Sequence, residues 1–242
     1  MPKNILIVAH PGHELRIFHW LERERPQVSI LTDGSGGEAS SRTAYSSDVL
    51  DTTGASRGPV FGEAPDRAWY NAILSRDASP FIQAAQAIAA SAGDEPEMCV
   101  VGDAVDGYNP VHDLANAVAG AVAARLSREG RKVSLLASQA VPIEGQPALT
   151  LRLDEAALAR KLAAVDAYLP LAEEARRMRE LAPADVETLH ESDFSWPPDF
   201  EPEWERFARK RVAAGTYDRP ITYRDHVRPL ALSVIEALAT AD

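Results

Sequence analysis

Residues 5–14 read ILIVAHPGHE: an apolar run of strand length leads directly into two histidines, His10 and His13. The run predicts a first β-strand that ends at the histidines. Open α/β sheets bind their ligands at the carboxyl ends of their strands. We therefore expect a functional site directly after this strand, and a metal site is the leading hypothesis.

The segments that follow predict an α/β fold with a mostly parallel sheet flanked by helices. A helix from Glu14 to about Arg25 is stopped by Pro26, and residues 28–32 form the second strand, so the chain opens with a βαβ unit. Further strands are expected at 98–102, 133–137 and 148–153, and helices at 66–76, 79–92, up to Arg128, from Glu155 and at 224–239. We interpret residues 34–65 as a long loop beside the site and residues 182–204 as irregular.

Composition indicates an ordinary globular protein, and the partner that we expect is a small-molecule substrate. Its 242 residues are 45% hydrophobic and 25% charged, which suits one domain over 1–242, with residues 182–242 as a C-terminal extension packed on it. A net charge of -11 argues against a nucleic-acid partner. Signal-peptide features and a membrane-length apolar run are lacking, so we expect a cytoplasmic protein that does not bind membranes. A homo-oligomer is compatible with this composition.

A third histidine, His112, lies in the loop that follows the predicted strand at 98–102. Because the carboxyl ends of parallel strands meet at one edge of a sheet, His10, His13 and His112 are expected to converge. Three imidazoles with an open fourth position form the ligand set of a catalytic zinc ion.

These residues resemble two motifs of the PIG-L or LmbE-like zinc N-deacetylases. The family ends its first strand with Ala-His-Pro-Asp-Asp-Glu, where this chain has AHPGHE at residues 9–14, and its later His-Pro-Asp-His motif corresponds to NPVH at residues 109–112. Order and spacing agree over roughly residues 4 to 170. The resemblance implies a Rossmann-like fold and a zinc-dependent hydrolase that removes an N-acyl group, usually acetyl, from an amino sugar or glycoconjugate.

Carried over by position, the resemblance makes His10, His13 and His112 the zinc ligands, with His13 in place of a carboxylate. Imidazole is an acceptable exchange for a carboxylate at zinc, and a neutral ligand leaves more of the ion's charge uncompensated. The aspartate that serves the family as general base is Gly12 here. The histidine that assists at the carbonyl oxygen is Asn109, which donates a hydrogen bond but does not titrate.

Loop carboxylates are the candidates to replace the missing base. Asp106 is preferred because it lies six residues before His112, and Asp103, Asp33 and Glu38 are alternatives; for each, a turn or a cap is the competing interpretation. Asp113 either orients a ligand imidazole or serves as a helix N-terminal charge. The residues expected to bind substrate are Asp33, Glu38, Arg42 and Tyr108.

The main hypothesis is thus a hydrolase with one divalent ion, zinc first and other transition metals as alternatives, in which Asp106 and Asn109 act catalytically. A second hypothesis is a member of the same fold that keeps the metal but is inactive or repurposed for ligand binding. A third is a nucleotide-dependent transferase whose histidines are structural.

Overall fold

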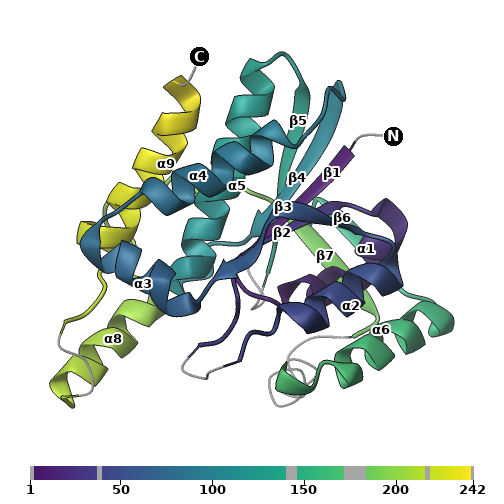
Figure 1. Cartoon of the computed structure of the whole chain (residues 1–242), viewed down its shortest axis with the longest axis horizontal. Helices are drawn as coiled ribbons and strands as arrows, with labels where there is room; N and C mark the ends of the chain where they lie inside the picture. The colour runs from purple at the N-terminus through teal and green to yellow at the C-terminus, as the bar shows by residue number, and fades with distance from the viewer. Residues whose placement is uncertain (1–2, 37–39, 140–145, 172–183, 216–218, 241–242) are drawn as a thin grey trace.

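The computed structural model describes residues 3–36, 40–139, 146–171, 184–215 and 219–240, and it is built around one sheet (Figure 1). In these residues the sheet has seven strands in the order β3-β2-β1-β4-β5-β7-β6. The strands are β1 (Lys3–Val8), β2 (Gln27–Thr32), β3 (Ser56–Ala64), β4 (Glu97–Asp103), β5 (Lys132–Ser138), β6 (Leu149–Arg152) and β7 (Val186–Glu191). The expected Rossmann-like α/β architecture with a mostly parallel sheet is confirmed, and the antiparallel pairs of β7 make the sheet mixed.

The first five strands of that order run parallel, and the βαβ opening predicted from the sequence is present. From β1 the chain crosses to β2 on one side, whereas from β4 it crosses to β5 on the other. β1 and β4 are hydrogen-bonded neighbours, so the strand order reverses between them. Crevices that bind ligands form at such a reversal, outside the carboxyl ends of the strands.

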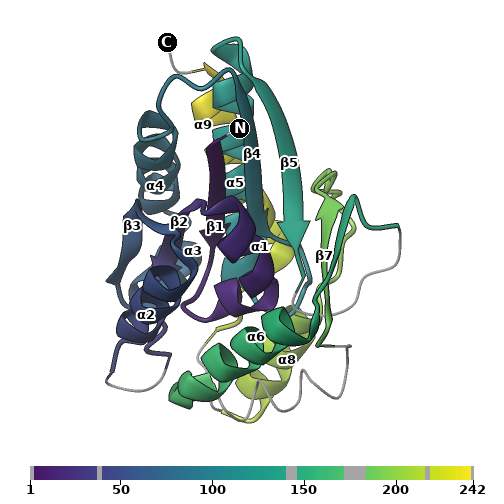
Figure 2. The same ribbon diagram turned by 90° about the vertical axis from the view of Figure 1, so that its right-hand side faces the viewer.

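Helices cover both faces of the sheet (Figure 2). One face carries α3 (Asp66–Ser75), α4 (Ser79–Ala90), α5 (Pro110–Arg128) and α9 (Arg228–Thr240); the other carries α1 (Phe18–Glu24), α2 (Thr43–Thr53) and α6 (Glu155–Ala167). β1 supplies both cores, because Ile5 and Ile7 point to the first and Leu6 and Val8 to the second. Side chains that alternate between two buried faces explain why this strand is apolar throughout.

Residues 34–65 are not the long loop that we expected, because they contain α2 and β3. The buried stripe of α2 includes two polar residues, Ser46 and Thr53, and so gives a weak hydrophobic period. β3 is the edge strand beside β2, and Phe61 is its one fully buried side chain within Ser56–Ala64. Half-exposed edge strands carry a faint sequence signal.

The C-terminal region is also more regular than the sequence indicated. Residues 182–204, expected to be irregular, include β7, which pairs antiparallel with β5 and β6, and α8 (Glu203–Ala213) begins at their end. The expected last helix is present as a π-helical turn, η3 (Tyr223–Val227), followed by α9. Strand β6 and the helix from Glu155, α6, are confirmed, and the side chain of Asp154 caps that helix. Among the described residues, no helix combines the length and apolarity needed to cross a bilayer.

Candidate metal centre

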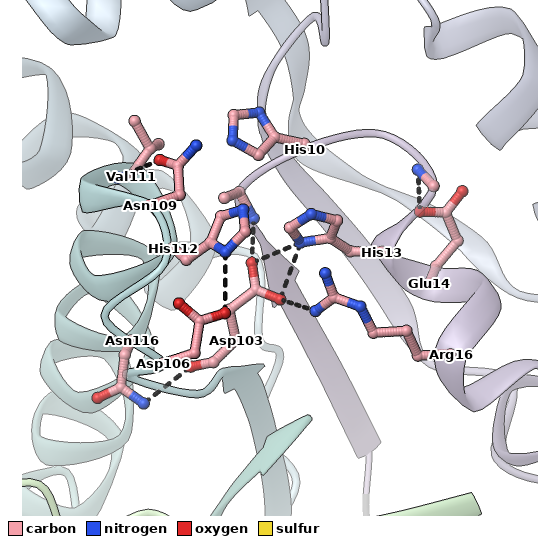
Figure 3. A network of polar contacts seen from close by, with 12 residues as sticks. His10, His13, Glu14, Arg16, Asp103, Asp106, Asn109, Val111, His112 and Asn116 are labelled. Atoms are coloured by element: carbon pink, nitrogen blue, oxygen red, sulfur yellow. Dashed lines mark hydrogen bonds and ion pairs between the residues drawn. The ribbon is translucent and has the colours of Figure 1, made fainter. Parts of the chain in front are cut away.

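The three histidines singled out in the sequence come together at the carboxyl ends of β1 and β4 (Figure 3). The ring centroids lie 5.3 Å apart for His10 and His13, 5.1 Å for His10 and His112, and 4.5 Å for His13 and His112. All three residues are less than a tenth exposed. His10 and His13 lie in and just after the turn that follows β1, with His13 opening the 3-10 turn η1 (His13–Ile17), and His112 lies in the first turn of α5.

Each imidazole turns its Nδ1 atom to the carboxylate of an aspartate. The pairs are His10 with Asp66 (2.9 Å), His13 with Asp103 (2.9 Å) and His112 with Asp106 (3.1 Å). A ring held in this way by Nδ1 keeps Nε2 for another partner, which is the usual arrangement behind a histidine metal ligand.

Protonation states favour neutral rings facing ionised carboxylates. Burial lowers the pKa of His10 and holds the pKa of His13 well below its ordinary value. Burial raises the pKa of Asp66, but its hydrogen bond and charge interaction with His10 outweigh this and bring that pKa to about 2. For Asp103, His13 and Arg16 likewise outweigh burial and hold the pKa well below its usual range. The Nδ1 hydrogens of these rings are therefore donated to the aspartates.

Asp103 is the most connected of the three aspartates. It is the last residue of β4 and 1% exposed, and it accepts hydrogen bonds from the backbone N–H of Ala9 at 2.7 Å and from Arg16 at 3.1 Å. The pairing of β1 with β4 brings it under the turn that carries His13. The sequence pointed to Asp103 as a candidate proton acceptor, whereas in the structure it holds a ring, a guanidinium and the backbone.

Asp66 was missed by the sequence reasoning. It is the first residue of α3, and it bonds His10 and accepts the backbone N–H of Gly36 at 2.7 Å. Because β3 was not predicted, nothing showed that α3 begins at the same edge of the sheet as the histidines. An acidic residue in the first turn of a helix is usually read as a favourable interaction with the helix dipole.

The donor set suits a divalent cation. If the histidines are counted as neutral, the three paired aspartates and Arg16 together carry a net formal charge of -2. The Nε2 atom of His10 is buried and has no hydrogen-bond partner among the described residues. Three imidazoles on one zinc ion have ring centres about 5 Å apart, since Zn–N bonds are about 2.0–2.1 Å and the angles near tetrahedral. The observed separations are close to this value.

Some adjustment of the rings is nevertheless needed for an ion to bind. In the described part of the chain, no group of three or more His, Cys, Asp or Glu side chains stands ready to hold a metal ion as placed. The chemistry of the donors fits the ion, and the rings would have to turn or shift to close on it.

Gly12, at the position where the resemblance implies a general base, has its surroundings filled by other side chains. Its φ of +103° is one that residues with a side chain rarely adopt. A Cβ atom built on Gly12 would collide with Cδ1 of Leu171 and lie 3.5 Å from the Tyr168 ring. The packing around Gly12 therefore leaves no room for an aspartate side chain at this position.

Asp106, the preferred substitute for that base, has both carboxylate oxygens engaged. Oδ2 faces His112, and Oδ1 accepts the backbone N–H of Tyr108 at 2.8 Å. It therefore orients a ring, the task that we considered for Asp113. Asp113 instead accepts the indole N–H of Trp204 at 2.7 Å, and burial raises its pKa to about 7.

Asn109 has one end of its amide fixed. It is the N-cap of α5, and its Oδ1 accepts the backbone N–H of Val111 at 2.8 Å. Figure 3 shows the amide nitrogen on the side that faces His10. Because the amide oxygen of Asn109 serves in the cap, the amide nitrogen remains to donate a hydrogen bond in the site.

The expected substrate residues have different surroundings. Oδ1 of Asp33 accepts the backbone N–H groups of Ser35 at 2.9 Å and Asp66 at 3.3 Å, so this residue holds its own turn and the start of α3. The Nε atom of Arg42 is buried without a hydrogen-bond partner among the described residues, and its guanidinium lies beside Gly34. Tyr108 is 58% exposed, with its ring centroid 6.4 Å from that of His112. Glu38 lies outside the described residues.

Comparison with known proteins adds no relative. No protein-family model matches the chain, and no curated protein or solved structure is significantly similar to it.

Proposed function

We propose that this protein is a metal-dependent amidohydrolase that removes an N-acyl group, acetyl in the first instance, from an amino sugar or glycoconjugate. Zinc is the proposed ion, on His10, His13 and His112. The observation that carries the proposal is the set of three buried histidines, each with Nδ1 bonded to its own aspartate. The amide substrate comes from the resemblance of residues 9–14 and 109–112 to the PIG-L or LmbE-like N-deacetylases.

The chain's own residues have distinct tasks in this proposal. Zinc, when bound, supplies Lewis acidity and hydroxide near neutral pH. Asp66, Asp103 and Asp106 accept hydrogen bonds from Nδ1 and orient the three rings, so that Nε2 would be free to bind the ion. The amide N–H of Asn109 donates to the substrate's carbonyl oxygen, where negative charge develops during acyl transfer.

Arg42 and Tyr108 are the proposed contacts for the rest of the substrate. The Arg42 Nε has no partner among the described residues, so its guanidinium is suited to an anionic or hydroxyl group. The exposed Tyr108 ring beside His112 offers an apolar face against which a sugar ring can stack.

One observation favours the second hypothesis, a protein that binds metal and ligand without hydrolysing it. Gly12 provides no general base, and Asp66, Asp103 and Asp106 are all engaged with the rings. A general base contributes about 10²- to 10⁴-fold to a rate. We therefore expect slow turnover from the hydrolase, and an absence of turnover identifies the alternative.

Metal analysis followed by an acetate-release assay tests the proposal. The purified protein is expected to bind one equivalent of zinc and to release acetate from at least one member of a panel of N-acetyl sugars. His112→Ala should lose both properties. His19→Ala is the matched control, because His19 bonds Glu22 on α1 and lies outside the ring cluster.

Three outcomes separate the hypotheses. A wild-type protein without bound metal refutes the metal centre and favours the transferase reading. Bound zinc without acetate release on any substrate favours the binding protein. Equal acetate release by wild type and His112→Ala would mean that the activity arises elsewhere.

A further inference from the structure

Trp204, in the C-terminal quarter of the chain, contacts the loop of the candidate metal centre with both of its N–H groups. Its backbone N–H donates to the carbonyl of Gly107 at 2.9 Å. Its indole N–H donates to Oδ2 of Asp113 at 2.7 Å. Trp204 is 5% exposed and Asp113 is fully buried, so both hydrogen bonds lie inside the protein.

Asp113 extends the contact to the same loop. Its other oxygen, Oδ1, accepts the backbone N–H of Gly107 at 3.2 Å. The Trp204 backbone N–H therefore holds the carbonyl of Gly107 directly. Asp113 holds the N–H of Gly107, and the Trp204 indole in turn holds Asp113. Two bonds on opposite sides of one residue fix the course of the loop at that point.

Gly107 lies beside the residue that orients the His112 ring. Asp106 precedes it and directs Oδ2 to His112, while Oδ1 accepts the N–H of Tyr108, the next residue. Gly107 has a φ of +65°, and a Cβ on it would lie 3.3 Å from Pro202. The segment at the start of α8 is thus packed closely on this turn.

We propose that Trp204 is a positioning residue for the candidate metal centre: its indole and backbone N–H groups hold Gly107 and Asp113 so that Asp106 keeps its bond to His112. This inference rests on the proposed metal function of the histidines. It makes the C-terminal segment, which the motif resemblance does not cover, part of the construction of the site.

The effect on metal binding is expected to be indirect and moderate. Loss of a residue that bonds a ligand directly costs about 10- to 100-fold in metal affinity. Trp204 acts one contact further out, through Asp113 and the loop, so we expect a loss of about threefold to tenfold.

Trp204→Phe tests the inference, with Trp69→Phe as its matched control. Both substitutions keep an aromatic ring at a buried position and remove one indole N–H. The indole N–H of Trp69 has no hydrogen-bond partner among the described residues. Zinc affinity, measured by competition with a chromophoric chelator, should fall about threefold to tenfold in Trp204→Phe and stay within twofold of wild type in Trp69→Phe.

Amide hydrogen exchange in the metal-free protein provides a readout that does not depend on zinc. The N–H groups of Gly107 and Tyr108 donate to Asp113 and Asp106, so Trp204→Phe should speed their exchange, whereas Trp69→Phe should not. If wild type binds no zinc, the metal proposal fails and exchange alone decides whether Trp204 holds the loop.

A second variant covers the case in which Trp204→Phe does not fold. Asp113→Asn keeps the size of the side chain but lacks one of the two acceptor oxygens used by Gly107 and Trp204. It should speed exchange at residues 107 and 108 as well. Exchange rates equal to those of wild type, in whichever of the two variants folds, would overturn the positioning role.

Discussion

The loop after β1 and the loop after β4 bring histidines to the same space, but they orient them by different means. His13 is bonded to Asp103, an aspartate 90 residues away, and His10 to Asp66 at the start of α3. His112 is bonded to Asp106, only six residues before it. The first loop is thus held by the tertiary fold, whereas the second carries its own aspartate.

This difference separates stability from ring orientation. Asp103 also holds the Ala9 backbone and Arg16, so the fold depends on it. The side-chain bonds of Asp106 reach only residues of its own segment, 106–112. Damage to the first arrangement should unfold the protein, and damage to the second should chiefly affect ligand geometry.

Asp103→Ala is expected to have the largest effect. The substitution leaves the Arg16 guanidinium and the Ala9 N–H without their buried partner, and breaking a buried pair from one side costs about 3–5 kcal/mol of unfolding free energy. Urea denaturation measures this loss. Asp106→Ala is the matched comparison and should lose clearly less; equal losses would erase the distinction between the two loops.

Asn109→Asp should separate the role of residue 109 as a helix cap from its proposed role as a hydrogen-bond donor to the substrate. Aspartate caps a helix as well as asparagine does, so unfolding free energy should change little, but the amide donor is lost. Removal of a donor to a developing oxyanion costs about 10²- to 10³-fold in turnover, measured as acetate release. Asn109→Ala should lose turnover and also about 1 kcal/mol of stability. Full turnover in Asn109→Asp would exclude the amide donor.

Gly12→Asp tests whether the first loop accepts the aspartate found in the resembling family. The strained φ and the collision with Leu171 predict a loss of about 1–3 kcal/mol in unfolding free energy, without a gain in acetate release. Adding Leu171→Ala should recover part of the loss beyond the sum of the single changes. Strict additivity in this double-mutant cycle would mean that the collision is not the cause.

Asp106→Asn should have little effect on stability and a selective effect on metal affinity. The shape is kept and the charge behind His112 is lost, so zinc affinity should fall about 10- to 100-fold while urea denaturation shows little change. Glu22→Gln, on the surface bond to His19, is a control that should leave zinc affinity unaltered. Unaltered affinity in Asp106→Asn would remove this aspartate from the site.

The sequence was sufficient for the parts that depend on local periodicity and order. The apolar run at residues 5–9 predicted β1, the βαβ opening predicted parallel pairing, and parallel pairing predicted that His10, His13 and His112 meet. The edge strand β3 and the antiparallel strand β7 were missed because partly exposed strands lack a strong hydrophobic period.

The roles of the aspartates could not be predicted from the sequence, for a physical reason. A carboxylate in a loop can serve as a general base, a helix cap or a hydrogen-bond partner of an imidazole. Its neighbours in the folded protein determine which of these roles it has. Asp103 and Asp106 were expected near the site and lie there, but bonds to His13 and His112 occupy them. Asp66 and Trp204 act across long sequence separations, for which a single chain gives no signal.

The Trp204 contact has a consequence for the order in which the molecule is completed during synthesis. Asp113 and Trp204 are 91 residues apart, so the loop with Asp106 acquires its last hydrogen bonds only after most of the chain has emerged. The partners of His13 and His10 are all in place much earlier. Since domains generally fold as units, the loop at Gly107 is held in its final form only once residue 204 is available.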